Sequence, residues 1–197
     1  MKWISYLLVA VGLIVFVSIF FPVAREETNY SVNQILNLKP DLTPPNKDFS
    51  IVIQKIAAVA PIIANVDYTD SKKYLPALKK GVAQAKNTAL PGQKGNFYLF
   101  AHSTDAFYDV SRYNAVFYLI GKLDKGDIVT VYYQGKEYDY EVYDKRIVNP
   151  DATEFLKTLT GNLNPSSSDQ TLTLQTCYPP GTTIKRLVIL AKLLSVK

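Results

Sequence analysis

The sequence predicts a mainly β domain, a small barrel or sandwich, preceded by an N-terminal transmembrane helix. Three observations carry this prediction: a charge-free apolar run near the amino terminus, many short β-branched runs after residue 49, and only a few short stretches with helical spacing. Many short strands with few helices are typical of barrels and sandwiches, which bury one face of each strand. We expect three parts: a transmembrane anchor over 1–24, a Pro-containing extracellular linker over 25–48, and the β domain over 49–197.

The anchor rests on Trp3–Val23, a run of 21 residues without a charge. At about 1.5 Å per residue, a helix of this length reaches about 31 Å and crosses the hydrocarbon layer of a bilayer. A cleaved signal peptide is the alternative, but its apolar part is shorter and ends in a small-x-small site. The best candidate site, Pro22–Ala24, has proline where a small residue is needed, so we expect an uncleaved anchor.

Charges beside the anchor predict its orientation. Lys2 precedes the apolar run, whereas Arg25 is followed at once by Glu26 and Glu27. Flanking positive charge favours the cytoplasmic side of a membrane. We therefore expect a single-pass protein of the cell membrane, with a cytoplasmic amino terminus and an extracellular β domain.

Within the β domain, period-two alternation and β-branched runs predict the strands, and glycines mark the ends of two short helices. The expected strands are 50–53, 56–63, 96–101, 128–133, 137–142, 171–177 and 184–190, and the expected helices are 74–78 and 113–120. Pro61 suggests that the second strand lies at an edge or carries a bulge. A long segment over 149–169 opens with a capping-box pair, Asp151 and Glu154, and long connections of this kind are often functional.

Composition excludes several kinds of site. One cysteine rules out an intramolecular disulfide, and with one histidine it removes the four-ligand structural zinc sites. The net charge of +5 is mild and no long basic run is present, so we predict no nucleic-acid partner. We also predict no cofactor and no metal ligand. Calcium modulation stays open, because Asp105, Asp109 and Glu141 could hold a cation although their spacing does not require it.

Cys177 is the candidate nucleophile. The leucines of the run 171–177 share one strand face, so Cys177 lies on the other, more polar face together with Gln175. The strand ends at the cysteine, before a turn at 178–181, and this placement gives a thiol the access that its chemistry requires. The alternative is a structural cysteine that is buried as a small hydrophobic residue.

His102 and Arg186 are the other candidates for chemistry. His102 follows the strand 96–101 and precedes a polar turn, although a lone histidine also fits an ordinary surface or core role. Arg186 stands nine positions after Cys177, at the start of an apolar strand. Burying an unpaired guanidinium is unfavourable, so we expect it to face a groove or an anion; a solvated strand end is the alternative.

Together these residues resemble the signature of sortases, the membrane-anchored cysteine transpeptidases. The run Thr171–Cys177 reads TLTLQTC and is followed by Arg186. Upstream, Pro91–Asn96 and then His102–Ser103 are similar to the family's proline-glycine to histidine segment.

Further similarities at 58–63, 81–83 and 126–127 extend the resemblance over about 49–194. Ala101 is a departure, because the family usually has glycine before the histidine. Asp41–Thr43 is not the Asp-Pro-aromatic lid that pilus-building members often carry, and this tilts the resemblance away from that subclass.

The resemblance implies a closed sortase-type β-barrel of about eight strands with a few short helices. It implies a cysteine transpeptidase in which Cys177 forms a thioester with an LPxTG-like sorting signal and His102 protonates the leaving amine. Arg186 would bind the substrate carbonyl or the oxyanion, Thr176 would contribute to substrate binding, and the segment 149–169 would form one wall of the groove.

The implied partners are secreted proteins with a C-terminal sorting signal and an amine acceptor, such as a peptidoglycan precursor or a pilin lysine. Two alternatives stay open. One is a membrane-tethered cysteine peptidase that hydrolyses the same type of peptide. The other is a non-catalytic β binding domain in which Cys177 is incidental.

Overall fold

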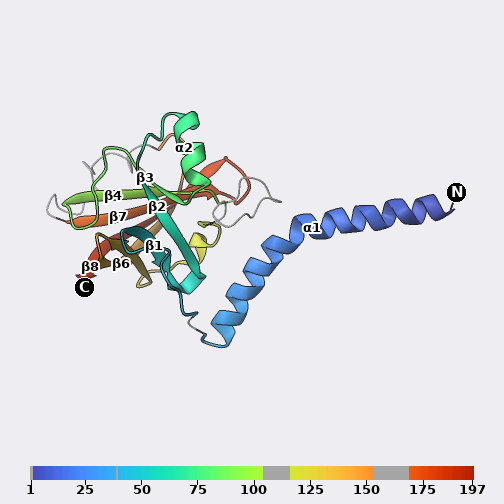
Figure 1. Cartoon of the computed structure of the whole chain (residues 1–197), viewed down its shortest axis with the longest axis horizontal. Helices are drawn as coiled ribbons and strands as arrows, with labels where there is room; N and C mark the ends of the chain where they lie inside the picture. Colours follow the sequence, from blue (N-terminus) through green and yellow to red (C-terminus); the bar gives the residue numbers. More distant parts are fainter. Residues whose placement is uncertain (1, 39, 104–115, 153–168) are drawn as a thin grey trace.

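The computed structural model describes residues 2–38, 40–103, 116–152 and 169–197 (Figure 1). The helices are α1 (Lys2–Ile35) and α2 (Ser71–Leu78), with short 3₁₀ helices η1 (Gln54–Ile56) and η2 (Ile120–Lys122). The strands are β1 (Phe49–Ile53), β2 (Ala58–Val66), β3 (Val82–Ala85), β4 (Gly95–Phe100), β5 (Ile128–Tyr133), β6 (Lys136–Val148), β7 (Gln170–Tyr178) and β8 (Lys185–Val196).

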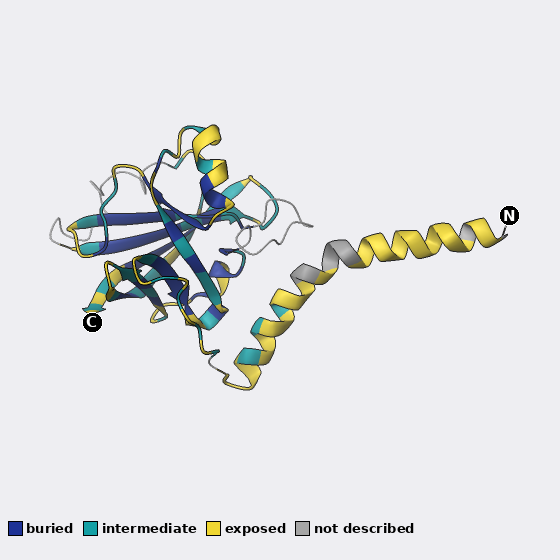
Figure 2. Cartoon of the chain, in the orientation of Figure 1, coloured by how far each residue is buried: buried dark blue, intermediate teal, exposed yellow. Residues whose placement is uncertain are grey.

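The strands form one closed barrel in the order β1-β2-β3-β4-β7-β8-β6-β5. The β2–β3 and β4–β7 pairs are parallel, and the others are antiparallel, including the β1–β5 pair that closes the ring. Figure 2 shows the buried residues concentrated along these strands and the exposed ones along α1. The prediction of a mainly β, closed, eight-stranded barrel is confirmed.

Side chains alternate between the two faces of the barrel wall, and each face has its own apolar cluster. Leu99, Leu174 and Ile189 point inward and are part of the large core that fills the barrel. The outward-pointing residues of the same strands form a second cluster, which we call the outer-face cluster. It contains the buried residues Ala85, Tyr98, Val188 and Leu190, with Phe100, Tyr143, Val148 and Ala152 packed against them.

Two backbone features explain local turns and strand contacts. Gln134 and Gly135 both have positive φ, 50° and 77°, and connect β5 to β6 as a tight two-residue hairpin turn. Gly81 lies so close to β2 that a Cβ atom there would stand 2.2 Å from the carbonyl oxygen of Pro61. Of the two alternatives for this strand, the edge is wrong, because β2 pairs with β1 on one side and β3 on the other, whereas its register with β3 does shift between Ile63 and Val66, as a bulge would produce.

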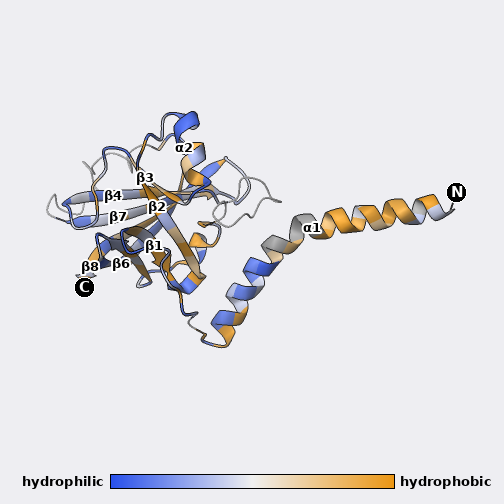
Figure 3. Cartoon of the chain, in the orientation of Figure 1, coloured by the Kyte–Doolittle hydropathy of each residue, from blue (hydrophilic) through white to orange (hydrophobic). Residues whose placement is uncertain are grey.

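Helix α1 extends beyond the segment that we expected to be helical. It continues to Ile35, and Thr28 and Ser31 donate back to the carbonyls of Ala24 and Glu27 at 2.7 and 2.8 Å. The first part of the expected linker is therefore helical. Figure 3 shows a hydrophobic amino-terminal half of α1 and a largely hydrophilic carboxyl-terminal half. No helix within the described residues is long and apolar enough to cross a membrane.

The carboxyl-terminal half of α1 contacts the barrel through a group that we call the α1 clasp: Glu27, Tyr30, Tyr118 and Lys122. Lys122 Nζ lies 3.1 Å from Glu27 Oε2 and 5.4 Å from the ring centre of Tyr30. Tyr30 also packs against the barrel core. Burial, followed by the nearby Glu27 carboxylate, raises the pKa of Tyr118. The clasp fixes α1 to the segment that leads into η2.

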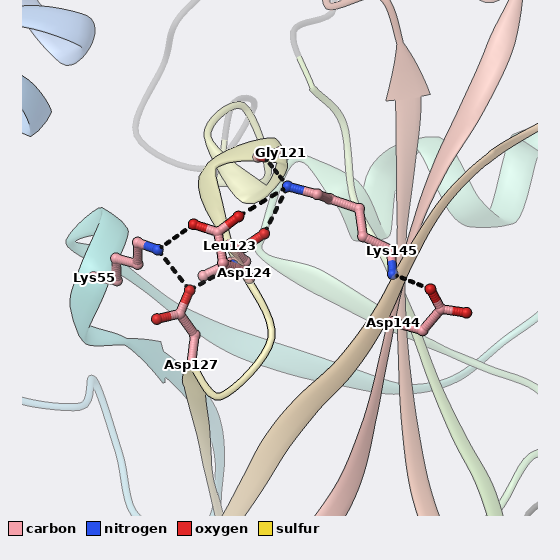
Figure 4. A network of polar contacts seen from close by, with 7 residues as sticks. All are labelled: Lys55, Gly121, Leu123, Asp124, Asp127, Asp144 and Lys145. Atoms are coloured by element: carbon pink, nitrogen blue, oxygen red, sulfur yellow. Dashed lines mark hydrogen bonds and ion pairs between the residues drawn. The ribbon is translucent and has the colours of Figure 1, made fainter.

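A second polar group, the Lys–Asp network, connects η1, the η2–β5 turn and β6 (Figure 4). Lys55 Nζ lies 2.9 Å from Asp124 Oδ2 and 2.7 Å from Asp127 Oδ2. Lys145 Nζ donates to the carbonyls of Gly121 and Leu123, both at 2.8 Å, and lies 3.4 Å from Asp124 Oδ1. Each cation therefore has several oxygen partners.

Candidate active site

Cys177 and Arg186 lie directly opposite each other on neighbouring strands. The β7–β8 register pairs them, and residues paired in this way project side chains to the same face. Leu174 and Leu187 point into the core, whereas Gln175 and Val188 point outward. By alternation, Cys177 and Arg186 share the outer face, as the sequence predicted for the cysteine.

His102 follows β4, which flanks β7 on the side opposite to β8 and Arg186. The parallel β4–β7 register pairs each residue with the one 75 positions later, from Gly95 with Gln170 to Phe100 with Gln175. The contact continues past β4, because the Ala101 amide donates to the Gln175 carbonyl at 3.1 Å. If the same offset continues for two residues past the end of β4, it puts His102 opposite Cys177. His102, Cys177 and Arg186 therefore form one row across three adjacent strand positions.

Thr176 holds this row in register from the opposite face. Its side chain is almost fully buried, and Oγ1 donates to the Ala101 carbonyl at 2.9 Å. That bond fixes β7 to the residue directly before His102. The side chain of Thr176 points away from Cys177 and positions β7, and its expected contribution to substrate binding stays a prediction.

Arg186 has polar partners but no counter-ion in the described part of the chain. Its Nη1 donates to the carbonyls of Thr183 and Lys185, at 3.1 and 3.0 Å. Burial raises the pKa of the Cys177 thiol, and the positive charge of Arg186 opposes this rise. Cys177 is a free cysteine that is partly buried. A site of this kind can stabilise a negative charge that develops beside the sulfur.

The part of the outer face next to the row, which we call the floor, contains the side-chain amide of Gln175. Strand alternation predicted Gln175 on this face but indicated no role for it. Gln175 lies between Phe100 on β4 and Val188 on β8. The hydroxyl of the buried Tyr98 donates to Gln175 Oε1 at 2.5 Å. Strand parity with Cys177 was the signal in the sequence that could have identified Gln175 as a floor residue.

A cleft of about 600 Å³ adjoins the row on the β6 side. It is lined by Ile147, Val148, Asn149, Asp151, Ala152 and Lys185. Val148 pairs with Arg186, and Lys185 Nζ donates to Asn149 Oδ1 at 2.5 Å, which joins β8 to the end of β6. Asn149–Ala152 are the described start of the long segment that we expected to form a groove wall. The rest of that wall, with the helix expected after Asp151, lies outside the described residues.

Modulation by calcium through Asp105, Asp109 and Glu141 stays open. Asp105 and Asp109 lie outside them, whereas Glu141 lies on β6. Within the described part of the chain, no three His, Cys, Asp or Glu side chains are grouped to hold a metal ion. The absence of a cofactor stays a prediction.

Comparison with known proteins agrees with the barrel. A family model of the sortase domain matches residues 51–194. The chain belongs to the sortase family. Sortase D of Bacillus subtilis (strain 168) is 29% identical over 176 residues, which span 87% of this chain and 76% of that protein. Sortases are cysteine transpeptidases, so this sortase is an enzyme of that class.

Solved sortases share the fold. Sortase E1 from Streptomyces coelicolor, whose structure holds a tripeptide in the active site, has a TM-score of 0.63 at 22% identity and covers 79% of this chain and 93% of that one. A Clostridium perfringens sortase D5 transpeptidase has a TM-score of 0.58 at 24% identity, with 86% and 89% covered. Sortase A of Listeria monocytogenes has a TM-score of 0.59 at 21% identity, with 76% and 88% covered.

Proposed function

We propose that this sortase cleaves an LPxTG-like sorting signal through a Cys177 thioester and transfers the acyl group to an amine. The row of His102, Cys177 and Arg186 across β4, β7 and β8 is the observation that carries the proposal. In this proposal the only cysteine of the sequence acts between the only histidine and Arg186, which has only carbonyl partners in the described chain. Nucleophilic catalysis by a thiol needs a base and a stabiliser of negative charge within reach.

The reaction proceeds in two balanced acyl-transfer steps. Cys177 Sγ gives its proton to His102 and attacks the carbonyl carbon; a C–S bond forms and the C–N bond breaks. His102 passes the proton to the leaving amine. An incoming amine then attacks the thioester, His102 takes its proton, and the thiolate leaves and is reprotonated. Arg186 stabilises the oxyanion in both steps.

We infer that α1 anchors the enzyme in the cell membrane, with the barrel outside. The charge-free run Trp3–Val23 supports this inference, and so does the exposure of those of its apolar side chains that the structure describes. Secreted proteins that end in a sorting signal, and an acceptor such as a peptidoglycan precursor or a pilin lysine, are then the partners. The secreted proteins and the acceptor are both accessible at the outer surface of the cell membrane, so an anchor keeps the enzyme close to them.

The test is a cleavage screen of the full-length enzyme in detergent micelles against a library of pentapeptide sorting signals, with and without an added amine. Wild type is expected to cleave a subset and to form a new amide with the added amine. Cys177→Ala is expected to abolish turnover, and His102→Ala to lower it by about 10³-fold or more. Circular dichroism checks that both variants fold.

Two outcomes contradict the proposal in different ways. Cleavage that yields only hydrolysed acid, even at high amine concentration, identifies a peptidase. Turnover that survives in Cys177→Ala, or that a methanethiosulfonate reagent leaves unchanged, excludes thiol catalysis and favours a binding domain.

A further inference from the structure

Gln175 is a polar side chain of the outer face whose neighbours on both adjacent strands are apolar. Gln175 stands two residues before Cys177 on the same face of β7. Its neighbours in the β4 and β8 positions are Phe100 and Val188, both in the outer-face cluster. A few placed polar groups on an apolar surface are what usually orient a bound ligand.

The amide of Gln175 has a fixed orientation. Tyr98 is fully buried, and its hydroxyl donates to Gln175 Oε1 at 2.5 Å. A planar amide whose oxygen is held in this way must direct its nitrogen elsewhere. The pair therefore works as a unit in which Tyr98 positions the side chain of Gln175.

The amide nitrogen is left as an accessible donor. Within the described residues, Gln175 Nε2 makes no hydrogen bond. The fully buried side-chain atoms without a partner are Ser103 Oγ and Gln170 Oε1, and Gln175 Nε2 is not among them. An unbonded atom that is not sealed from solvent is free to bond a ligand.

The spacing identifies the group that this donor would meet. Two strand residues span about 6.6 Å, which is also the reach of two residues in an extended peptide. The leaving amine lies toward His102, which protonates it, so the acyl part of the peptide extends over the remaining floor. An acceptor at this distance from the scissile carbonyl is another main-chain carbonyl of the acyl part.

We propose that Gln175 is a specificity-determining residue that donates from Nε2 to a main-chain carbonyl about two residues before the scissile bond, and that Tyr98 is its positioning residue. The proposal rests on the proposed function, because it concerns the peptide that Cys177 attacks. Breaking the contact leaves a carbonyl desolvated on an apolar floor without a partner, which weakens binding.

The test is steady-state cleavage of a sorting-signal peptide by the full-length Gln175→Leu variant in micelles. We expect KM to rise about tenfold while kcat stays within about twofold, because the lost contact lies away from the reacting atoms. Tyr98→Phe is expected to raise KM about threefold. Gln34→Leu, the same substitution on an exposed position of α1, is the matched control and should leave both constants unchanged.

The double variant Gln175→Leu/Tyr98→Phe separates binding from folding. It removes the hydroxyl whose hydrogen bond the Gln175→Leu substitution breaks, so thermal stability is expected to recover in part while KM stays high. A peptide series with each carbonyl oxygen replaced in turn by sulfur, a weaker acceptor, locates the contact. Wild type should penalise sulfur at one position of the acyl part, and Gln175→Leu should lose that penalty.

Three results decide the proposal. An unchanged KM in Gln175→Leu, or a sulfur penalty that persists in it, overturns the role of Gln175 and leaves the proposed function intact. If KM in the double variant recovers together with stability, the effect of Gln175→Leu is a folding effect, and this result also overturns the role of Gln175. Failure of wild type to cleave any sorting-signal peptide overturns the proposed function and this inference together.

Discussion

The Lys–Asp network and the catalytic row are both polar groups on the barrel wall, but their charges are arranged in opposite ways. In the network, Lys55 lies between two carboxylates, and the hydrogen bond from Lys55 lowers the pKa of Asp124 (Figure 4). In the row, Arg186 bonds only to carbonyls of its own turn within the described chain, and burial raises the pKa of Cys177.

This difference distinguishes a group that maintains the fold from one that is ready to react. Opposite charges that are already in contact stabilise each other, so a new ligand adds no further stabilisation. A cation without a counter-ion beside a desolvated thiol favours the states in which negative charge appears, the thiolate and the oxyanion. We expect substitutions in the row to change turnover and leave stability alone, and substitutions in the network to do the reverse.

Among the substitutions that test this contrast, the largest effect is expected for Arg186→Gln. The positive charge of Arg186 opposes the rise in the pKa of Cys177 that burial causes. Without this charge the pKa of the thiol rises further, and its alkylation profile shifts to higher pH. Loss of the guanidinium also removes an oxyanion partner, and kcat/KM is expected to fall by about 10²–10³-fold. The measurements are peptide cleavage and the rate of iodoacetamide alkylation between pH 6 and 10.

Arg186→Lys separates the charge of this residue from its geometry. The lysine keeps the positive charge but lacks the planar fork, so the alkylation profile should stay near that of wild type while kcat/KM still falls. Thermal stability should be unchanged in both variants. A loss of stability that accounts for the loss of turnover would place Arg186 with the network, and the contrast between the two clusters would fail.

Lys55→Met tests the other side of the comparison. Partial burial alone lowers the pKa of Lys55, but its hydrogen bonds to Asp127 and Asp124 raise it above the ordinary value. The ammonium ion is therefore more stable in the folded state, and its removal is expected to lower the free energy of unfolding by about 1 kcal/mol and Tm by about 3 °C. Thermal unfolding and peptide cleavage measure the two effects.

The expected pH dependence has a definite sign. A raised lysine pKa contributes stability below its unfolded value, and that stability is lost as pH rises through the folded value. The lowered pKa of Asp124 contributes stability above its ordinary value, which is lost as pH falls through the lowered one. Lys136→Met, an exposed lysine without an ion pair in the described chain, is the control. Equal destabilisation in both variants, or reduced turnover in Lys55→Met, contradicts the assignment.

The sequence predicted every strand except β3, and the outer-face position of Cys177, because both depend on local alternation, which has a period of two residues. The pairing of Cys177 with Arg186 also follows from a short chain distance, since one turn connects β7 to β8. The placement of His102 was not predictable in this way, because an offset of 75 residues in a parallel pair leaves no local pattern.

Long-range pairing also explains the errors. Pro61 has the local character of an edge residue, but barrel closure gives β2 a neighbour on each side. Thr176 adjoins Cys177 in the chain, but alternation turns its side chain inward to the Ala101 carbonyl. The continuation of α1 to Ile35 follows from side-chain bonds and from the α1 clasp, and neither appears in a hydropathy pattern.

The smallest effect is expected at the α1 clasp, where the partners are about 40% exposed and water weakens the ion pair. Glu27→Gln should weaken docking of α1 by about 0.5 kcal/mol, which speeds amide exchange over residues 27–35 about twofold without changing cleavage of a soluble peptide. Reversal of both charges, Glu27→Lys with Lys122→Glu, should restore the exchange rates, and Glu26→Gln, an exposed neighbour, is the matched control. If the reversed pair exchanges as fast as Glu27→Gln alone, the ion pair does not hold the helix, and the contacts of Tyr30 with the core must do so.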